Sequence, residues 1–79
     1  MDKLELEALR FALDLLESAL APGTETVERS FSSAARMNRC ADWLEQIIEP
    51  LDINVEVERL KRLNDRDRND HLVVVRYIR

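Results

Sequence analysis

The start of the chain carries its most regular hydrophobic pattern. Residues 2–21 are dominated by Leu, Ala, Glu and Arg, which are good helix formers. Asp2 is placed to cap a helix, with Glu5 three residues later, and Ala21-Pro22-Gly23 is a strong stop signal. The pattern therefore predicts a helix over residues 2–21.

Apolar residues cover well over half of the circumference of this predicted helix. They are Leu4, Leu6, Leu9, Phe11, Ala12, Leu13, Leu15, Leu16 and Leu20. An ordinary surface helix carries an apolar stripe of roughly 100° or a little more. We therefore expect the first helix to be covered from two sides, or to meet another chain.

Residues 24–49 also fit a helix, with Thr24 or Thr26 as the cap and Pro50 as the end, because the residue before a proline avoids helical geometry. The apolar positions change phase along this segment: Val27, Phe31 and Ala34 share one face, and Met37, Ala41, Leu44, Ile48 and Leu51 share another. This fits either one long helix with two packing surfaces or a break near residues 35–38. Because no Gly or Pro marks a break there, we favour one helix, with a kink as an option.

Two strands follow, over residues 53–63 and 71–79. The first alternates apolar and polar positions with period two, and the alternation slips at Arg59-Leu60, where we expect a bulge. The second is a β-branched run, and seven polar residues, 64–70, separate the two. The prediction is one α+β domain over residues 1–79, in the order α-α-β-β, with two helices packed on an antiparallel β-hairpin.

The last predicted strand is apolar on both faces. Val73, Val75 and Tyr77 lie on one, and Leu72, Val74 and Ile78 on the other. A strand of this kind is normally interior, which a two-stranded sheet does not allow. We therefore expect a further buried surface, with the last strand as an edge that pairs with its copy or with a partner's strand.

Composition excludes several classes of protein. A chain of 79 residues with one Cys and one Gly has no internal disulfide framework, no multi-cysteine zinc site and no glycine-rich phosphate loop. No stretch is long enough to span a membrane, and we recognise no family signature. We expect no cofactor, no metal site and no membrane association. The single Cys40 fits a reducing compartment, most simply the cytoplasm.

Charge is unevenly distributed around the net value of −4. Residues 1–22 carry five acids and two bases, residues 23–51 five acids and three bases, and residues 52–79 six acids and seven bases. The hairpin arginines suggest a wing that could reach nucleic acid, but alternating Asp and Arg cancel at the predicted tip. Direct nucleic-acid binding is therefore an alternative and not the main prediction.

No catalytic constellation is visible. His71 follows a polar turn, where nothing desolvates it, and we expect an ordinary histidine at the start of a strand. Cys40 has Arg36 and Arg39 nearby but no base within reach along the chain, which predicts a small packing residue. The sequence therefore predicts no catalytic residue.

Arginines and the single Trp fall together on the second predicted helix. Arg29, Ser33, Arg36, Cys40 and Trp43 share one face, with Arg39 at its margin. Arg and Trp are enriched at binding hot spots, so we predict Arg29, Arg36, Arg39 and Trp43 as partner-binding residues. The alternative is a solvated face with Trp43 packed against the hairpin.

These observations favour a small, acidic, non-enzymatic interaction module that regulates or inhibits a protein partner. One version is a phage or mobile-element inhibitor of nucleic-acid-handling machinery, of the anti-CRISPR type, whose acidic surface meets a basic groove. Two alternatives remain: a nucleic-acid binder that uses the arginine-rich hairpin, and a homodimeric assembly subunit joined through the last strand or the first helix.

Overall fold

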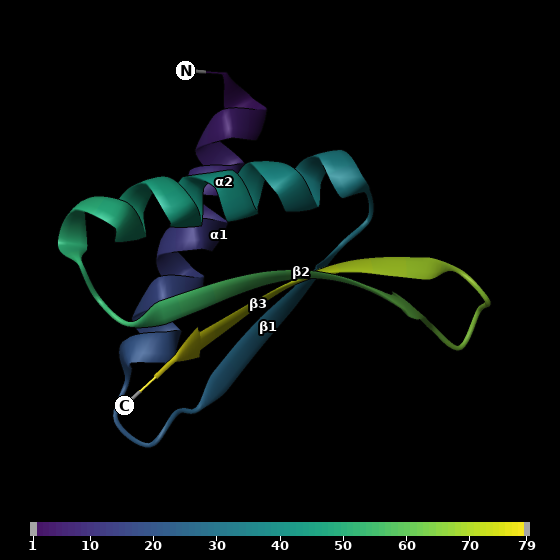
Figure 1. Cartoon of the computed structure of the whole chain (residues 1–79). Coiled ribbons are helices and arrows are strands. Elements are labelled where there is room, and N and C mark those ends of the chain that lie inside the picture. Colours follow the sequence, from purple (N-terminus) through teal and green to yellow (C-terminus); the bar gives the residue numbers. More distant parts are fainter. Residues whose placement is uncertain (1, 79) are drawn as a thin grey trace.

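The computed structural model describes residues 2–78 and has the element order helix, strand, helix, strand, strand (Figure 1). The elements are α1 (Lys3–Leu20), β1 (Thr26–Phe31), α2 (Ala34–Leu51), β2 (Val55–Leu63) and β3 (Asn69–Tyr77). The α+β class is confirmed. The predicted order is wrong, because a strand, β1, separates the two helices.

The signals read for the first helix are confirmed. The Asp2 carboxylate accepts a hydrogen bond from the Glu5 backbone N–H at 2.8 Å, which satisfies one of the free donors of the first turn. The helix ends at Leu20, immediately before the predicted stop. Its buried positions are mostly small: Ala8, Ala12 and Ala19 face the interior together with Leu15 and Leu16.

The single helix predicted over residues 24–49 is wrong. The change of phase in its apolar positions marks a change of secondary structure, because Val27 and Phe31 belong to β1 and the later apolar residues to α2. Neither Thr24 nor Thr26 caps a helix; the cap is Ser33, whose hydroxyl accepts a hydrogen bond from the Arg36 N–H at 3.2 Å.

The predicted end of this helix before Pro50 is also wrong. Pro50 lies within the last turn of α2, and the helix ends one residue later at Leu51. A proline here disrupts only the final turn, so its cost is limited. The reversal comes instead from Asp52, which takes the left-handed backbone conformation, with φ of 51°.

The sheet has three strands in the order β1-β3-β2. β1 and β2 both pair antiparallel with β3, so they run parallel to each other, and α2 connects them across one face of the sheet. This is a βαβ unit with a third strand inserted between its two strands. The last strand, predicted as an edge, is therefore the centre of the sheet.

The predicted antiparallel pairing of the last two strands is confirmed as the β2–β3 hairpin. The predicted bulge at Arg59-Leu60 is wrong, because the register runs without interruption from Val55 opposite Tyr77 to Leu63 opposite Asn69. The connection is also shorter than predicted. Asn64 closes it through its side-chain oxygen, which accepts hydrogen bonds from the backbone N–H groups of Arg66 and Arg68 at 2.8 and 3.1 Å.

The hydrophobic core lies between the helices and one face of the sheet. Odd-numbered residues of the strands face the helices, with Val73 and Val75 fully buried at the centre against Cys40, Ala41 and Leu44 of α2. The molecule measures 37 × 31 × 16 Å, and its shortest dimension, 16 Å, is the thickness of two packed layers. Figure 1 shows α1 and α2 crossing at a steep angle, while the β2–β3 hairpin projects beyond the helices as an arm.

Most of the second apolar face of the last strand is buried although no described helix covers it; of its three predicted residues, only Ile78 is exposed, at 44%. Leu72 and Val74 are only 2% and 7% exposed. On either side lie the side chains of the neighbouring strands, and the Arg62–Glu28 ion pair, at 3.2 Å, joins β2 to β1 across β3. Because Arg62 is opposite Asp70 and Glu28 opposite Val74, the pair crosses β3 near Leu72.

Candidate protein-interaction surface

Arg29, the first of the four predicted partner-binding residues, lies on β1 and not on the second helix. Its guanidinium carbon sits 3.7 Å from the centre of the Phe11 ring, within the range of a cation–π contact. Phe11 meets Phe31 edge to face, with ring centres 5.8 Å apart. Arg29 therefore covers an aromatic pair that joins α1 to β1.

The other three predicted residues, Arg36, Arg39 and Trp43, lie on α2 and contact acids of α1. Arg36 Nη1 lies 3.8 Å from Glu7 Oε1, and Arg39 Nε lies 3.7 Å from Glu5 Oε1. The indole N–H of Trp43 donates a hydrogen bond to Glu5 at 3.2 Å. The structure thus brings the four residues into contacts that hold α1 against α2 and β1. The sequence could not show this, because those contacts depend on the crossing of the two helices.

The space beside these residues is too small for a ligand. A cavity of about 10 Å³ is lined by Leu4, Glu7, Ala8, Phe11, Phe31, Arg36 and Arg39. That volume holds about one water molecule. The contact between α1, α2 and β1 is therefore a packed junction and not a substrate cleft.

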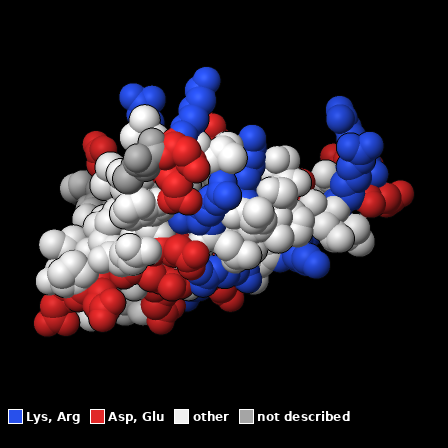
Figure 2. Space-filling model, turned by 90° about the horizontal axis from the view of Figure 1, so that it is seen from above, with Lys and Arg blue, Asp and Glu red and all other residues white. Residues whose placement is uncertain are grey.

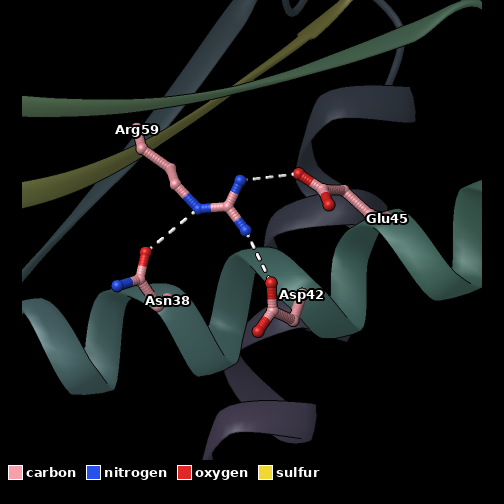
Figure 3. A network of polar contacts seen from close by, with 4 residues as sticks. All are labelled: Asn38, Asp42, Glu45 and Arg59. Atoms are coloured by element: carbon pink, nitrogen blue, oxygen red, sulfur yellow. Dashed lines mark hydrogen bonds and ion pairs between the residues drawn. The ribbon is translucent and has the colours of Figure 1, made fainter.

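Arg59, predicted as part of a basic hairpin surface, is tied to α2 (Figure 3). Its guanidinium group donates hydrogen bonds to Asp42 and Glu45 at 2.7 Å each and to Asn38 at 3.1 Å. These three acceptors lie on successive turns of α2, so one side chain bridges the helix to β2. The two ion pairs leave this cluster with one excess negative charge.

The largest row of exposed apolar side chains on a helix belongs to α1. Leu6, Leu13 and Leu20 are 49%, 48% and 40% exposed, and Leu9 beside them is half-buried. We call these four residues the leucine ridge. Their spacings of three, four and seven place them on one side of the helix, away from the buried alanines. One side of the wide apolar arc is therefore buried and the other is exposed, so the described residues do not supply the expected cover from two sides.

Charged side chains border the leucine ridge on its outer flank. Lys3, Arg10 and Glu17 recur every seven residues beside the leucines and are exposed. In the view from above, acidic side chains gather along the lower left of the molecule, and basic and acidic side chains lie together at the far end of the arm (Figure 2). An apolar centre with a charged rim is the usual anatomy of a protein–protein contact.

Groups with potential chemistry are dispersed in the described part of the chain. Burial raises the pKa of the Cys40 thiol to about 11, although the Arg29 charge lowers it somewhat, so the thiol is protonated and unreactive. His71 lies within β3, with its Nδ1 buried and without a hydrogen-bond partner. Among residues 2–78, no three His, Cys, Asp or Glu side chains converge as metal ligands.

The arm combines both signs of charge. Its bases are Lys61, Arg62, Arg66 and Arg68 and its acids are Asp65, Asp67 and Asp70, with strict alternation over residues 65–68. Four bases against three acids give little net field for a phosphate backbone. Over residues 2–78, neither helix has the length and hydrophobicity of a membrane span.

Comparison with protein-family profiles, with curated proteins and with solved structures found no match to this chain.

Proposed function

We propose that this chain is a non-enzymatic protein-interaction module that binds a protein partner through the leucine ridge of α1 and regulates or inhibits that partner by covering its surface. The observation that carries the proposal is the exposure of Leu6, Leu13 and Leu20 at 40–49% on one side of a helix. The predicted Arg and Trp residues support it less, because each already contacts α1.

The energetics favour a partner at this surface. Burying the exposed half of a leucine side chain is worth about 1 kcal/mol. Three such leucines on a preformed helix supply a rigid apolar centre, and Lys3, Arg10 and Glu17 supply a charged rim that orients the partner. The geometry suits a partner with its own apolar helix or groove.

The finer role that the sequence suggested fits the same arrangement. With a net charge of −4, the chain is attracted to a basic surface, such as the nucleic-acid groove of a phage host's machinery. In that role, the leucine ridge binds the partner, and the acidic side chains elsewhere on the chain occupy the partner's basic groove. Nucleic-acid binding by the arm is the runner-up; a salt-dependent shift of duplex or single-stranded nucleic acid would favour it.

Site-specific photo-crosslinking tests the proposed surface. A photoreactive benzoyl-phenylalanine replaces Leu13 on the ridge or, as the control, Ser18, which is exposed on the opposite side of the same helix. The chain is then irradiated in cells of its source. We expect a discrete protein adduct at position 13 and none at position 18. With the partner purified, Leu13→Glu should weaken binding at least tenfold; equal adducts at both positions, or none, would contradict the proposal.

A further inference from the structure

The outer edge of β2 is the longest unpaired strand edge in the described sheet. β2 has nine residues against six in β1, and β3 pairs with only one side of it. The Ile78 N–H donates a hydrogen bond to the Asn54 carbonyl at 2.8 Å, just before β2 begins. In an antiparallel ladder, bonded residues alternate, so the even-numbered residues of β2 bond to β3, and the backbone groups of the odd-numbered ones point outward.

This edge also carries exposed apolar side chains. Leu63 is 68% exposed, more than any other large apolar residue described, and Leu60 is 42% exposed. Edge strands of soluble proteins usually carry charges that discourage pairing. β2 has such charges, but they are arranged with opposite signs on either side of Leu60.

We propose that β2 pairs antiparallel with β2 of a second copy of this chain, about a two-fold axis at Leu60. On the face of the sheet away from the helices, this register places Leu60 opposite its own copy. Glu58 then lies opposite the second copy's Arg62, and Arg62 opposite its Glu58. An apolar pair is thus flanked by two pairs of opposite charge, each of which stabilises a sheet.

The other symmetric registers near the middle of β2 are unfavourable. An axis at Glu58, Arg59 or Lys61 places a charged residue opposite its own copy. An axis at Val57 places Glu56 opposite the second copy's Glu58, twice. Like charges directly opposite each other destabilise strand pairing. Leu60 is therefore the favoured axis.

The helix-facing side of the pairing is also complementary. Val57 lies opposite the second copy's Leu63, which buries the most exposed leucine. Arg59 lies opposite the second copy's Lys61, but Arg59 is bonded to Asp42 and Glu45, and this cluster has an excess negative charge. It therefore attracts the incoming lysine.

The contact that Arg62 makes within one chain does not oppose the pairing. Its ion pair with Glu28 joins side chains that are 60% and 48% exposed, and exposed pairs contribute little to stability. The product is a six-stranded sheet with four helices on one face. Its interface is β2, so each α1 still carries its own leucine ridge, and the dimer presents two of them. This inference does not depend on the proposed function.

Disulfide trapping tests the register. In the proposed pairing, the two Leu60 residues form a non-hydrogen-bonded pair with Cα atoms about 4.5 Å apart, which a disulfide can bridge. Leu60→Cys should therefore form a disulfide-linked dimer roughly tenfold faster than Leu63→Cys under mild oxidation, although position 63 is more exposed. The native Cys40 is fully buried and does not compete. Equal rates, or a faster reaction at position 63, would overturn the proposal.

Charge reversal tests the complementarity by sedimentation equilibrium. The wild-type chain should dimerise with a Kd below roughly 1 mM. Glu58→Arg should raise the Kd roughly tenfold, and the exchange Glu58→Arg/Arg62→Glu should restore it. Glu25→Arg, which changes the net charge equally away from β2, should leave the Kd unchanged. A monomer throughout, an unaffected Glu58→Arg variant, or a double variant without recovery would each overturn the pairing.

Discussion

β3 and α1 are the two elements with more apolar surface than one side of a helix or strand requires, and the fold treats them differently. β3 lies between two strands, and its second face is closed by their side chains, so Leu72 is 2% exposed. α1 has no described element against its second face, and Leu13 there is 48% exposed. The same sequence signal thus marks a central strand in one case and an open surface in the other.

The difference shows what apolar excess can and cannot predict. The number of apolar faces indicates how many sides of an element are buried, but not whether the chain itself covers them. For β3, the covering strand is β1, which was hidden within a predicted helix. For α1, no described element covers the leucine ridge, so its second side stays open to solvent.

Truncation of one leucine in each region should give the largest difference. Leu72→Ala should lower the free energy of unfolding by about 2–4 kcal/mol, because it leaves a cavity in a closed site. Leu13→Ala should lower it by less than about 1 kcal/mol, because that side chain is half in water. Urea denaturation in dilute solution measures both. Similar losses would mean that the two regions do not differ in burial as described.

The alkaline stability should show how well the helix-facing side of β3 excludes water. The Cys40 pKa is raised from 9.0 to about 11 in the folded chain, so the unfolded chain loses this proton first as the pH rises. The protonated thiol therefore makes its full contribution to stability below pH 9. This contribution is lost towards pH 11, which lowers the free energy of unfolding by roughly 2–3 kcal/mol. The free energies of unfolding of wild type and Cys40→Ala, measured between pH 8 and 11, isolate the contribution of the thiol. If both free energies change with pH in the same way, the prediction is wrong.

The ion pair across the open face of β3 should have the smallest effect. In a double-mutant cycle, Arg62→Ala and Glu28→Ala should couple by about 0.5 kcal/mol or less, because both side chains are largely in water. Thermal denaturation at low protein concentration is sufficient for the measurement. A coupling above about 1 kcal/mol would show that the pair, and not the flanking strands, closes the surface over Leu72.

The local signals in the sequence predicted much of the fold. Helix α1, its Asp2 cap, its end before Pro22 and the antiparallel pairing of β2 with β3 all follow from neighbouring residues. β1 was missed because its apolar residues, Val27 and Phe31, are four apart, a spacing that also fits a helix. Residues 26–31 form a strand because they pair with residues 71–76, which lie far along the chain.

The candidate surface was predictable only in part. The wide apolar arc of α1 is visible in the sequence, and its exposed side is the leucine ridge. Arg36, Arg39 and Trp43 lie on one helix as predicted, but Arg29 lies on β1, and the acidic partners Glu5 and Glu7 come from another helix. Spacing along one segment does not reveal whether a charged side chain faces solvent or a neighbouring element.

The position of β3 has a consequence for how the chain folds. β1 and β2 pair with β3 and not with each other, so no strand pairing of this sheet exists until residues 69–77 are in place. The β1–β3 contacts join segments some forty to fifty residues apart, and such non-local pairing slows folding. During synthesis, both helices and two strands leave the ribosome before either strand has a partner. We therefore expect the sheet to form in one late step, when β3 enters between β1 and β2.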